Sequence, residues 1–151
     1  MRLRTAGILF DSDILDDDPN HYRRTREDAE GAAHILGLVL HAFESGKWMW
    51  VQGAPGDWES GHGRVFTLTG AIWHIANGRH ELHAPAHSAA VRYLAAWIVQ
   101  SHGSRSYHVT TKIVRDYNNA EGRTLDEVLA MLNRAYEEAR DEAMGDWHSR
   151  S

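Results

Sequence analysis

Three histidines near the middle of the chain have a spacing that could hold a metal ion. His80, His83 and His87 form the pattern H-x2-H-x3-H, which can gather imidazoles where a loop leads into a helix. Neutral imidazole is a good ligand for zinc or nickel. Glu81 is the only carboxylate within this stretch, and the chain contains no H-E-x-x-H sequence. We therefore interpret these residues as exposed loop histidines and keep a zinc-dependent hydrolase as an alternative.

Two aspartates near the N-terminus are a second arrangement that could do chemistry. The run ILFDSD, with Asp11 and Asp13, is similar to the first motif of haloacid-dehalogenase phosphatases, where one carboxylate is the nucleophile and the other an acid or base. Ile14 and Leu15 stand where that motif needs glycine and threonine, and the sequence lacks the alternating strand–helix pattern of that fold. We therefore interpret residues 1–20 as an acidic, solvated segment.

Other catalytic patterns are missing from the sequence. It contains no G-x-S-x-G elbow, no glycine loop followed by Lys-Ser/Thr that would cradle a phosphate, and no dinucleotide fingerprint. It also contains no cysteine, which excludes disulfides, thiolate metal sites and a cysteine nucleophile. No catalytic residue can be named, so we expect a protein that is not an enzyme and needs no cofactor.

Composition and charge narrow the class of protein further. The chain has 151 residues, of which 42% are hydrophobic and 25% charged, as in a soluble globular domain. No apolar run could span a bilayer, and the N-terminus lacks the long apolar region of a signal peptide, so we expect a cytoplasmic location. The net charge is −5, and Arg23, Arg24 and Arg26 form one small basic cluster. A weak nucleic-acid-binding regulator therefore remains an alternative only.

Hydrophobic periodicity predicts a mainly α fold, with about five helices in a single compact domain over residues 21–145. The acidic segment 1–20 precedes this domain, and residues 146–151 form a tail. The first helix, from about Arg24 to Ser45, is apolar around much of its circumference, so we expect it to be central. The other helices are expected at 67–77, from about Pro85 to His102, around Ile113, and after Thr124.

A connection rich in tryptophan and glycine follows the first helix. Alternation around Trp50 predicts a short strand, with Val65 and Phe66 returning as its partner in a short β-hairpin, or else an extended connection. Tryptophan is favoured at interaction hot spots. We assign Trp50 to the core and predict that Trp48 and Trp58 are contact residues for a partner.

The last third of the chain contains the clearest helix signal. Thr124 and Glu127 have the spacing of a capping box, in which each side chain bonds a backbone N–H at the helix start. Asn118, Asn119 and Gly122 before them suit a turn. Arg123 has no structural role that the sequence identifies, so it is a third candidate contact residue.

Three stretches resemble motifs of a family whose function is itself unassigned. They are WVQGA from Trp50, TLTGAI from Thr67 and DYNNAEGRTLDEVL from Asp116. They are similar, in order, to the W-x-Q-G, C-L-L-G-A and W-N-D…G-R-T-x-x-E-V-L motifs of an uncharacterised domain family of actinobacteria and their bacteriophages. Tyr117, Asn119 and Thr67 depart from the usual Trp, Asp and Cys. The resemblance implies a helical domain of actinobacterial or phage origin and carries no activity.

These observations favour a small non-enzymatic protein that acts by protein–protein interaction. The expected partner is another protein or a second copy of the chain, and no membrane is involved. If a phage encodes the protein, its place of action is the host cytoplasm.

Overall fold

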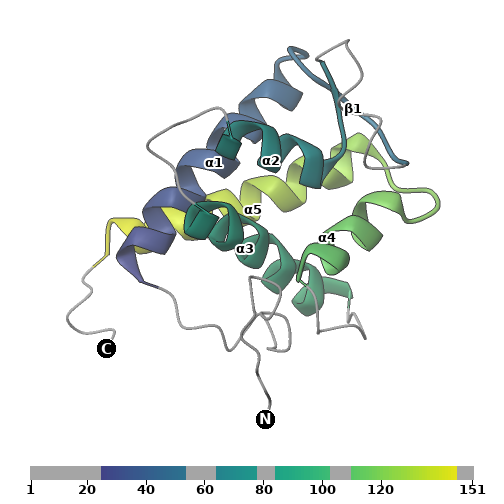
Figure 1. Cartoon of the computed structure of the whole chain (residues 1–151). Helices are drawn as coiled ribbons and strands as arrows, with labels where there is room; N and C mark the ends of the chain where they lie inside the picture. Colours follow the sequence, from purple (N-terminus) through teal and green to yellow (C-terminus); the bar gives the residue numbers. More distant parts are fainter. Residues whose placement is uncertain (1–24, 54–63, 78–83, 103–109, 146–151) are drawn as a thin grey trace.

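The computed structural model describes residues 25–53, 64–77, 84–102 and 110–145. Within these ranges the chain forms five helices and two short strands, which confirms the prediction of a mainly α fold (Figure 1). Their bounds are Arg26–Glu44 for α1, Met49–Trp50 for β1, Val65–Phe66 for β2, Leu68–Asn77 for α2, Ala84–His102 for α3, Thr110–Asn119 for α4 and Leu125–Ala143 for α5. The predicted acidic segment 1–20 and the tail 146–151 lie outside the described residues.

Helices α1 and α5 both begin with a capping box. The N–H of Asp28 donates to the Thr25 hydroxyl at 3.0 Å, and the N–H of Thr25 donates to the Asp28 carboxylate at 3.0 Å. The predicted capping box of α5 is confirmed, with matching bonds between Thr124 and Glu127 of 3.2 and 3.0 Å. Each pair satisfies two backbone donors that a helix start leaves open, so the sequence itself fixes where α1 and α5 begin.

Helices α1 and α5 pack against each other in opposite directions. Arg26 at the start of α1 donates to the carbonyl of Gly145, just beyond the end of α5, at 3.0 Å. Midway along, Gly37 faces Tyr136, and a Cβ atom on Gly37 would lie 2.9 Å from Tyr136 Cε1. Because glycine has no side chain, the two helices approach closely at this level.

Helix α1 contacts α2, α3 and α5, so the prediction that it is central is confirmed. In Figure 1, α2 and α3 lie in front of the α1–α5 pair, and α4 lies beyond the right-hand end of α3. Eight residues of α1 are buried: Ala29, Ala32, Ile35, Leu36, Val39, Leu40, Ala42 and Phe43. They belong to one apolar core that all five helices share.

The two strands pair in parallel, with Met49 opposite Val65 and Trp50 opposite Phe66. Val65 and Phe66 are the predicted partner, but the predicted hairpin is wrong. A hairpin joins antiparallel strands by a short turn, whereas parallel strands need a longer connection that returns the chain to the same end. The segment between β1 and β2 is long enough to make that return.

The turn before α5 begins later than the sequence suggested. Asn118 and Asn119 are the last two residues of α4 and do not form the turn, which is a correction. Asn118 follows Val114 by four residues and lies on the same buried face of α4. Gly122, with φ of +82°, supplies the left-handed turn conformation that favours glycine.

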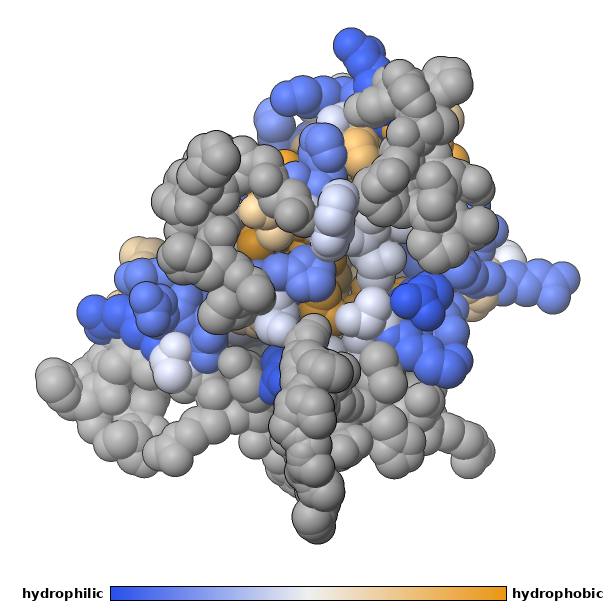
Figure 2. Space-filling model, viewed as in Figure 1, coloured by the Kyte–Doolittle hydropathy of each residue, from blue (hydrophilic) through white to orange (hydrophobic). Residues whose placement is uncertain are grey.

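On the face shown in Figure 2, hydrophilic residues dominate the outer edges of the described surface, and apolar residues are visible near its centre. None of the helices in the described part of the chain is long and apolar enough to cross a membrane.

Candidate functional site

The side chain of Asn118 is the centre of a buried set of polar contacts. Its exposed fraction is 1%. Its Oδ1 accepts from the indole N–H of Trp50 at 2.6 Å and from the N–H of Leu68 at 3.1 Å. Its Nδ2 donates to the Val51 carbonyl at 3.2 Å and to Asn119 Oδ1 at 2.8 Å. A carboxamide has two acceptor and two donor positions, so the hydrogen-bonding capacity of Asn118 is fully used.

These bonds join three elements that are distant in sequence. Trp50 lies in β1, Leu68 is the first residue of α2, and Asn118 lies in the last turn of α4. Thr67 adds to the junction, because its buried hydroxyl accepts from the N–H of Gly70 at 3.1 Å and so caps the start of α2. The three stretches that carry the family resemblance therefore meet at one place in the fold.

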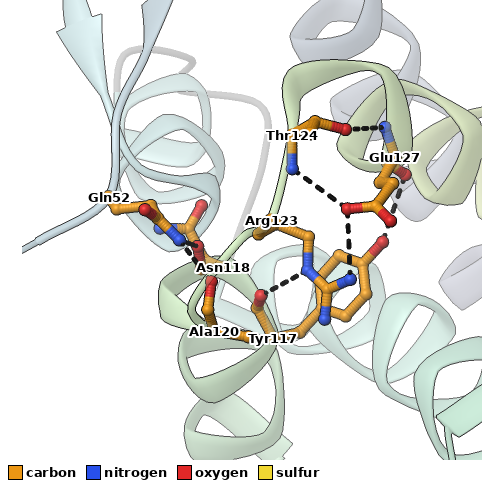
Figure 3. A network of polar contacts seen from close by, with 7 residues as sticks. All are labelled: Gln52, Tyr117, Asn118, Ala120, Arg123, Thr124 and Glu127. Carbon is orange, nitrogen blue, oxygen red and sulfur yellow. Dashed lines mark hydrogen bonds and ion pairs between the residues drawn. The ribbon is translucent and has the colours of Figure 1, made fainter.

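Gln52 and Gly53, which follow β1, add further hydrogen bonds between this strand and the end of α4. The Gln52 Nε2 atom donates to the carbonyl of Asn118 at 3.0 Å and to that of Ala120 at 2.7 Å (Figure 3). The N–H of Gly53 donates to Asn119 Oδ1 at 3.0 Å. The last carbonyls of a helix have no partner within it, so the Gln52 side chain satisfies the end of α4. We call Trp50 to Gly53, Leu68, Asn118 and Asn119 the Asn118 cluster.

Arg123 has a structural role that the sequence did not identify. Its Nε donates to the Tyr117 carbonyl at 2.9 Å, and its guanidinium carbon lies 3.8 Å from the centre of the Tyr117 ring. It also forms an ion pair with Glu127 at 3.4 Å, and only 13% of its side chain is exposed (Figure 3). Arg123 thus fixes the turn between α4 and α5. A contact between Arg123 and a partner protein stays a prediction.

Two ionisable groups of this turn have shifted pKa values. The backbone N–H of Thr124 donates to the Glu127 carboxylate and holds the pKa of Glu127 below its usual value, with Arg123 adding to the effect. Burial raises the pKa of Tyr117 above the usual value for a tyrosine. The Tyr117 hydroxyl donates to the Glu127 carbonyl at 3.1 Å, so the neutral phenol is the form that fits here.

The structure places Trp48 in the core and not on the surface. Its exposed fraction is 8%, and its ring centre lies 4.3 Å from that of Phe66 and 5.6 Å from that of His74. Because the ring is packed against these neighbours, little of Trp48 is open to a partner. Trp58, the other tryptophan predicted to make contacts, lies outside the described residues.

The predicted metal site falls largely outside the described part of the chain. His80 and His83 are not described, and His87 lies on α3, where it is partly buried. Among the residues that the structure does describe, no group of three or more histidine, aspartate or glutamate side chains could hold a metal ion. The zinc site at His80, His83 and His87 stays a prediction.

A second polar region, which the sequence analysis missed, lies along the outer side of α5. It is a groove of about 790 Å³, lined by Trp97 of α3 and by Ala130, Asn133, Arg134, Glu137, Glu138, Asp141 and Glu142 of α5. We call it the α3–α5 groove. The Arg134 guanidinium lies 5.1 Å from the centre of the Trp97 ring. The carboxylates recur at helical spacing on one face, which is the signal that could have revealed the groove.

Two of the residues that line this groove have buried polar groups, the Glu142 carboxylate and the Trp97 indole N–H. Glu142 accepts a hydrogen bond from the hydroxyl of Tyr93 at 2.5 Å, which ties the end of α5 to α3. The indole Nε1 of Trp97 is buried and has no hydrogen-bond acceptor among the described residues. The groove therefore differs from the Asn118 cluster, where each polar atom of the central side chain has a partner.

Comparisons with known proteins identify a family but no activity. No curated protein and no solved structure matches the chain significantly. The model of a family of unknown function, DUF6197, matches residues 27–138, which run from the first turn of α1 into the last third of α5. This match confirms the prediction of an uncharacterised family, while the predicted origin and motifs stay predictions. The chain belongs to DUF6197, a family of unknown function.

Proposed function

We propose that this protein works by binding another protein and that it does not catalyse a reaction. We further propose that it is of actinobacterial or phage origin and acts in the cytoplasm, which is the host cytoplasm if a phage encodes it. The resemblance of its three motif stretches to phage and actinobacterial sequences supports that origin.

The observation that carries the proposal is that the polar residues of the motif stretches form hydrogen bonds within the fold. A general acid, base or nucleophile must be free to contact its substrate. Asn118 instead bonds Trp50, Val51, Leu68 and Asn119 with its whole amide group. Gln52 is likewise held by two backbone carbonyls. Their bonds support a structural role, in which these residues connect β1, α2 and the end of α4.

Two surface features support binding as the function: the α3–α5 groove and the exposed apolar side chains near β1 and α2. The α3–α5 groove contains the Trp97 ring and the Arg134 guanidinium, two kinds of side chain that are enriched at protein interfaces. Met49 is 62% exposed and Trp73 is 44% exposed, so apolar surface is also open near β1 and α2. Such features suit a partner that is a folded protein or a peptide.

Chemical crosslinking in a lysate of an actinobacterial host, followed by affinity capture and mass spectrometry, tests this function. We expect one protein to be captured reproducibly and to capture this chain when it is tagged in turn. Light scattering of the purified chain distinguishes a second copy from a foreign partner. A monomer that captures no partner in either direction would contradict the proposal.

A further inference from the structure

We propose that an exposed face of α1 binds zinc together with the same face of a second copy of this chain. The face consists of Glu30, His34, Gly37, His41 and Glu44, and we call it the α1 face. The inference rests on the proposed function, takes the partner to be a second copy and assigns a metal to the contact. Three features support it: two pairs of metal-ligating side chains, their spacing along the helix and a groove between them.

The α1 face carries two pairs of histidine and glutamate. Glu30 and His34 are four residues apart, His41 and Glu44 are three apart, and all four side chains are exposed. Side chains at these spacings are neighbours on a helix, with Cβ atoms about 5–6 Å apart, so each pair can contact one ion. None of the four side chains has a hydrogen bond or ion pair within the described part of the chain. All four are therefore available as ligands.

Each pair is only half of a zinc site. Zinc in proteins takes three or four side-chain ligands, with imidazole nitrogens and carboxylate oxygens about 2.0–2.2 Å away. Within one copy, the described residues contain no group of three or more side chains that could hold a metal. A mixed set of imidazoles and carboxylates suits zinc, whereas magnesium and calcium prefer oxygen ligands alone. The missing ligands must come from a second molecule.

The spacing of the two pairs makes the α1 face complementary to itself. The four ligands follow the order Glu, His, His, Glu, and the middle of this order lies at Gly37. A second α1 in the opposite direction, with a two-fold axis near Gly37, places Glu30 and His34 of one copy beside His41 and Glu44 of the other. Two equal sites result, about 16 Å apart at the usual rise of a helix, each with two imidazoles and two carboxylates. Opposite directions also bring together helix ends of opposite partial charge.

A groove lies between the two pairs. It has a volume of about 320 Å³, and its lining residues include His34, Gly37, Leu38, His41, Glu44 and Tyr136. No arginine or lysine occurs among the described residues that line it, so no cation there competes with a metal. Leu38 and Tyr136 are partly buried and lie beside Gly37, where they offer apolar contact close to the two-fold axis. An apolar centre with polar groups around it is the usual composition of a protein interface.

Light scattering after size-exclusion chromatography of the full chain tests the inference. We expect a monomer in EDTA, a dimer when Zn²⁺ is in small molar excess, and one bound zinc per chain by elemental analysis. Mg²⁺ at the same concentration should leave the monomer unchanged. A chain that stays monomeric with zinc would overturn the inference. A dimer that persists in EDTA, or that forms equally with Mg²⁺, would do the same because the histidines would then not be needed.

Two substitutions test the antiparallel arrangement. Each site contains His34 of one copy and His41 of the other, so His34→Ala or His41→Ala removes one ligand from both sites. We expect either variant to raise the zinc concentration needed for half-dimerisation at least about tenfold, since even loss of a group that only supports a ligand costs about that much. An equal mixture of the two variants forms a mixed dimer in which one site keeps both histidines. The mixture should therefore dimerise at a lower zinc concentration than either variant alone, and a mixture that does not would overturn the inference.

The matched control is His80→Ala/His83→Ala, which removes two histidines of the other predicted zinc site. We expect this variant to dimerise as the natural chain does, and a monomer would overturn the inference. Urea unfolding in EDTA checks that the exposed α1 positions do not affect the fold. If zinc produces no dimer but the capture experiment yields a foreign partner, the proposed function survives and only this inference is wrong. If capture also fails, both are wrong.

Discussion

The molecule holds two tryptophan side chains in opposite situations. The indole N–H of Trp50 donates to the buried Asn118 at 2.6 Å. The indole N–H of Trp97 is also buried but has no acceptor among the described residues. Trp50 lies in the Asn118 cluster, where the Asn118 amide is fully bonded, and Trp97 lines the α3–α5 groove, where its ring contacts Arg134. The contrast is between an indole N–H that helps to hold the fold together and one that contributes no hydrogen bond among the described residues.

Truncation of Asn118 should give the largest loss of stability and is the strongest test of this contrast. In Asn118→Ala, the donors of Trp50 and Leu68 lose their acceptor, and the Val51 carbonyl loses a donor. Each buried polar group left unpaired costs about 1–3 kcal/mol, so we expect a loss of about 3 kcal/mol or more in the free energy of unfolding, measured by urea denaturation. The control Asn133→Ala, at an exposed position of α5, should change it by less than about 0.5 kcal/mol.

The turn beside the cluster should be the next most sensitive place. Arg123→Ala removes the bond to the Tyr117 carbonyl and the contact with its ring, and we expect a loss of about 1–2 kcal/mol. Arg123→Lys keeps the charge but cannot reproduce the planar contact, so it should recover only part of that loss. Arg115→Ala, an exposed arginine of α4, serves as the control in the same urea series. A loss as large in Arg115→Ala would contradict the role given to Arg123.

Alkaline pH offers a way to sharpen the picture of this turn. Burial in the folded state raises the pKa of Tyr117 above the ordinary tyrosine value of 10.0, so folding favours the protonated phenol. The stabilising effect is therefore complete below pH 10 and is lost as the pH rises through the higher folded value. Thermal unfolding at pH 8 to 11 should show a steeper alkaline fall for the natural chain than for Tyr117→Phe. Parallel curves for the two proteins would count against the shift.

The groove should give the smallest effect on stability, and one of opposite sign. Glu137→Gln/Asp141→Asn removes like charges near the end of α5, so we expect no loss and a gain of up to about 0.5 kcal/mol in the free energy of unfolding. A clear loss in the urea transition would mean that these carboxylates hold the fold together, and the division between the two regions would fail.

Local signals in the sequence predicted much of the fold. The stripe around Leu36 and Val39 predicted the central helix, and Thr124 with Glu127 predicted the start of α5. These features depend on residues a few positions apart, so the sequence contains all the information needed. Gly122 was assigned to a turn for the same reason, and its positive φ agrees.

What the sequence did not predict depends on residues that are far apart. Asn118 was assigned to a turn because asparagine favours turns, yet Trp50 and Leu68 come to it from 68 and 50 positions away and make its burial favourable. The spacing of Asn118 from Val114 was the available clue. Trp97 and Glu137 could not be placed in one groove before the packing of α3 on α5 was known. Trp58 and His80 lie in segments that the structure does not describe, so their predicted roles stay predictions.

The most direct test of the contrast is the hydrogen exchange of the two indole N–H groups, followed by NMR after transfer into D₂O. Trp50→Phe and Trp97→Phe assign the two signals. The account predicts that the Trp50 N–H, bonded to Asn118, exchanges only through global unfolding, and that the Trp97 N–H exchanges orders of magnitude faster through small movements of the groove. Equal protection of the two, or a slower Trp97, would contradict it.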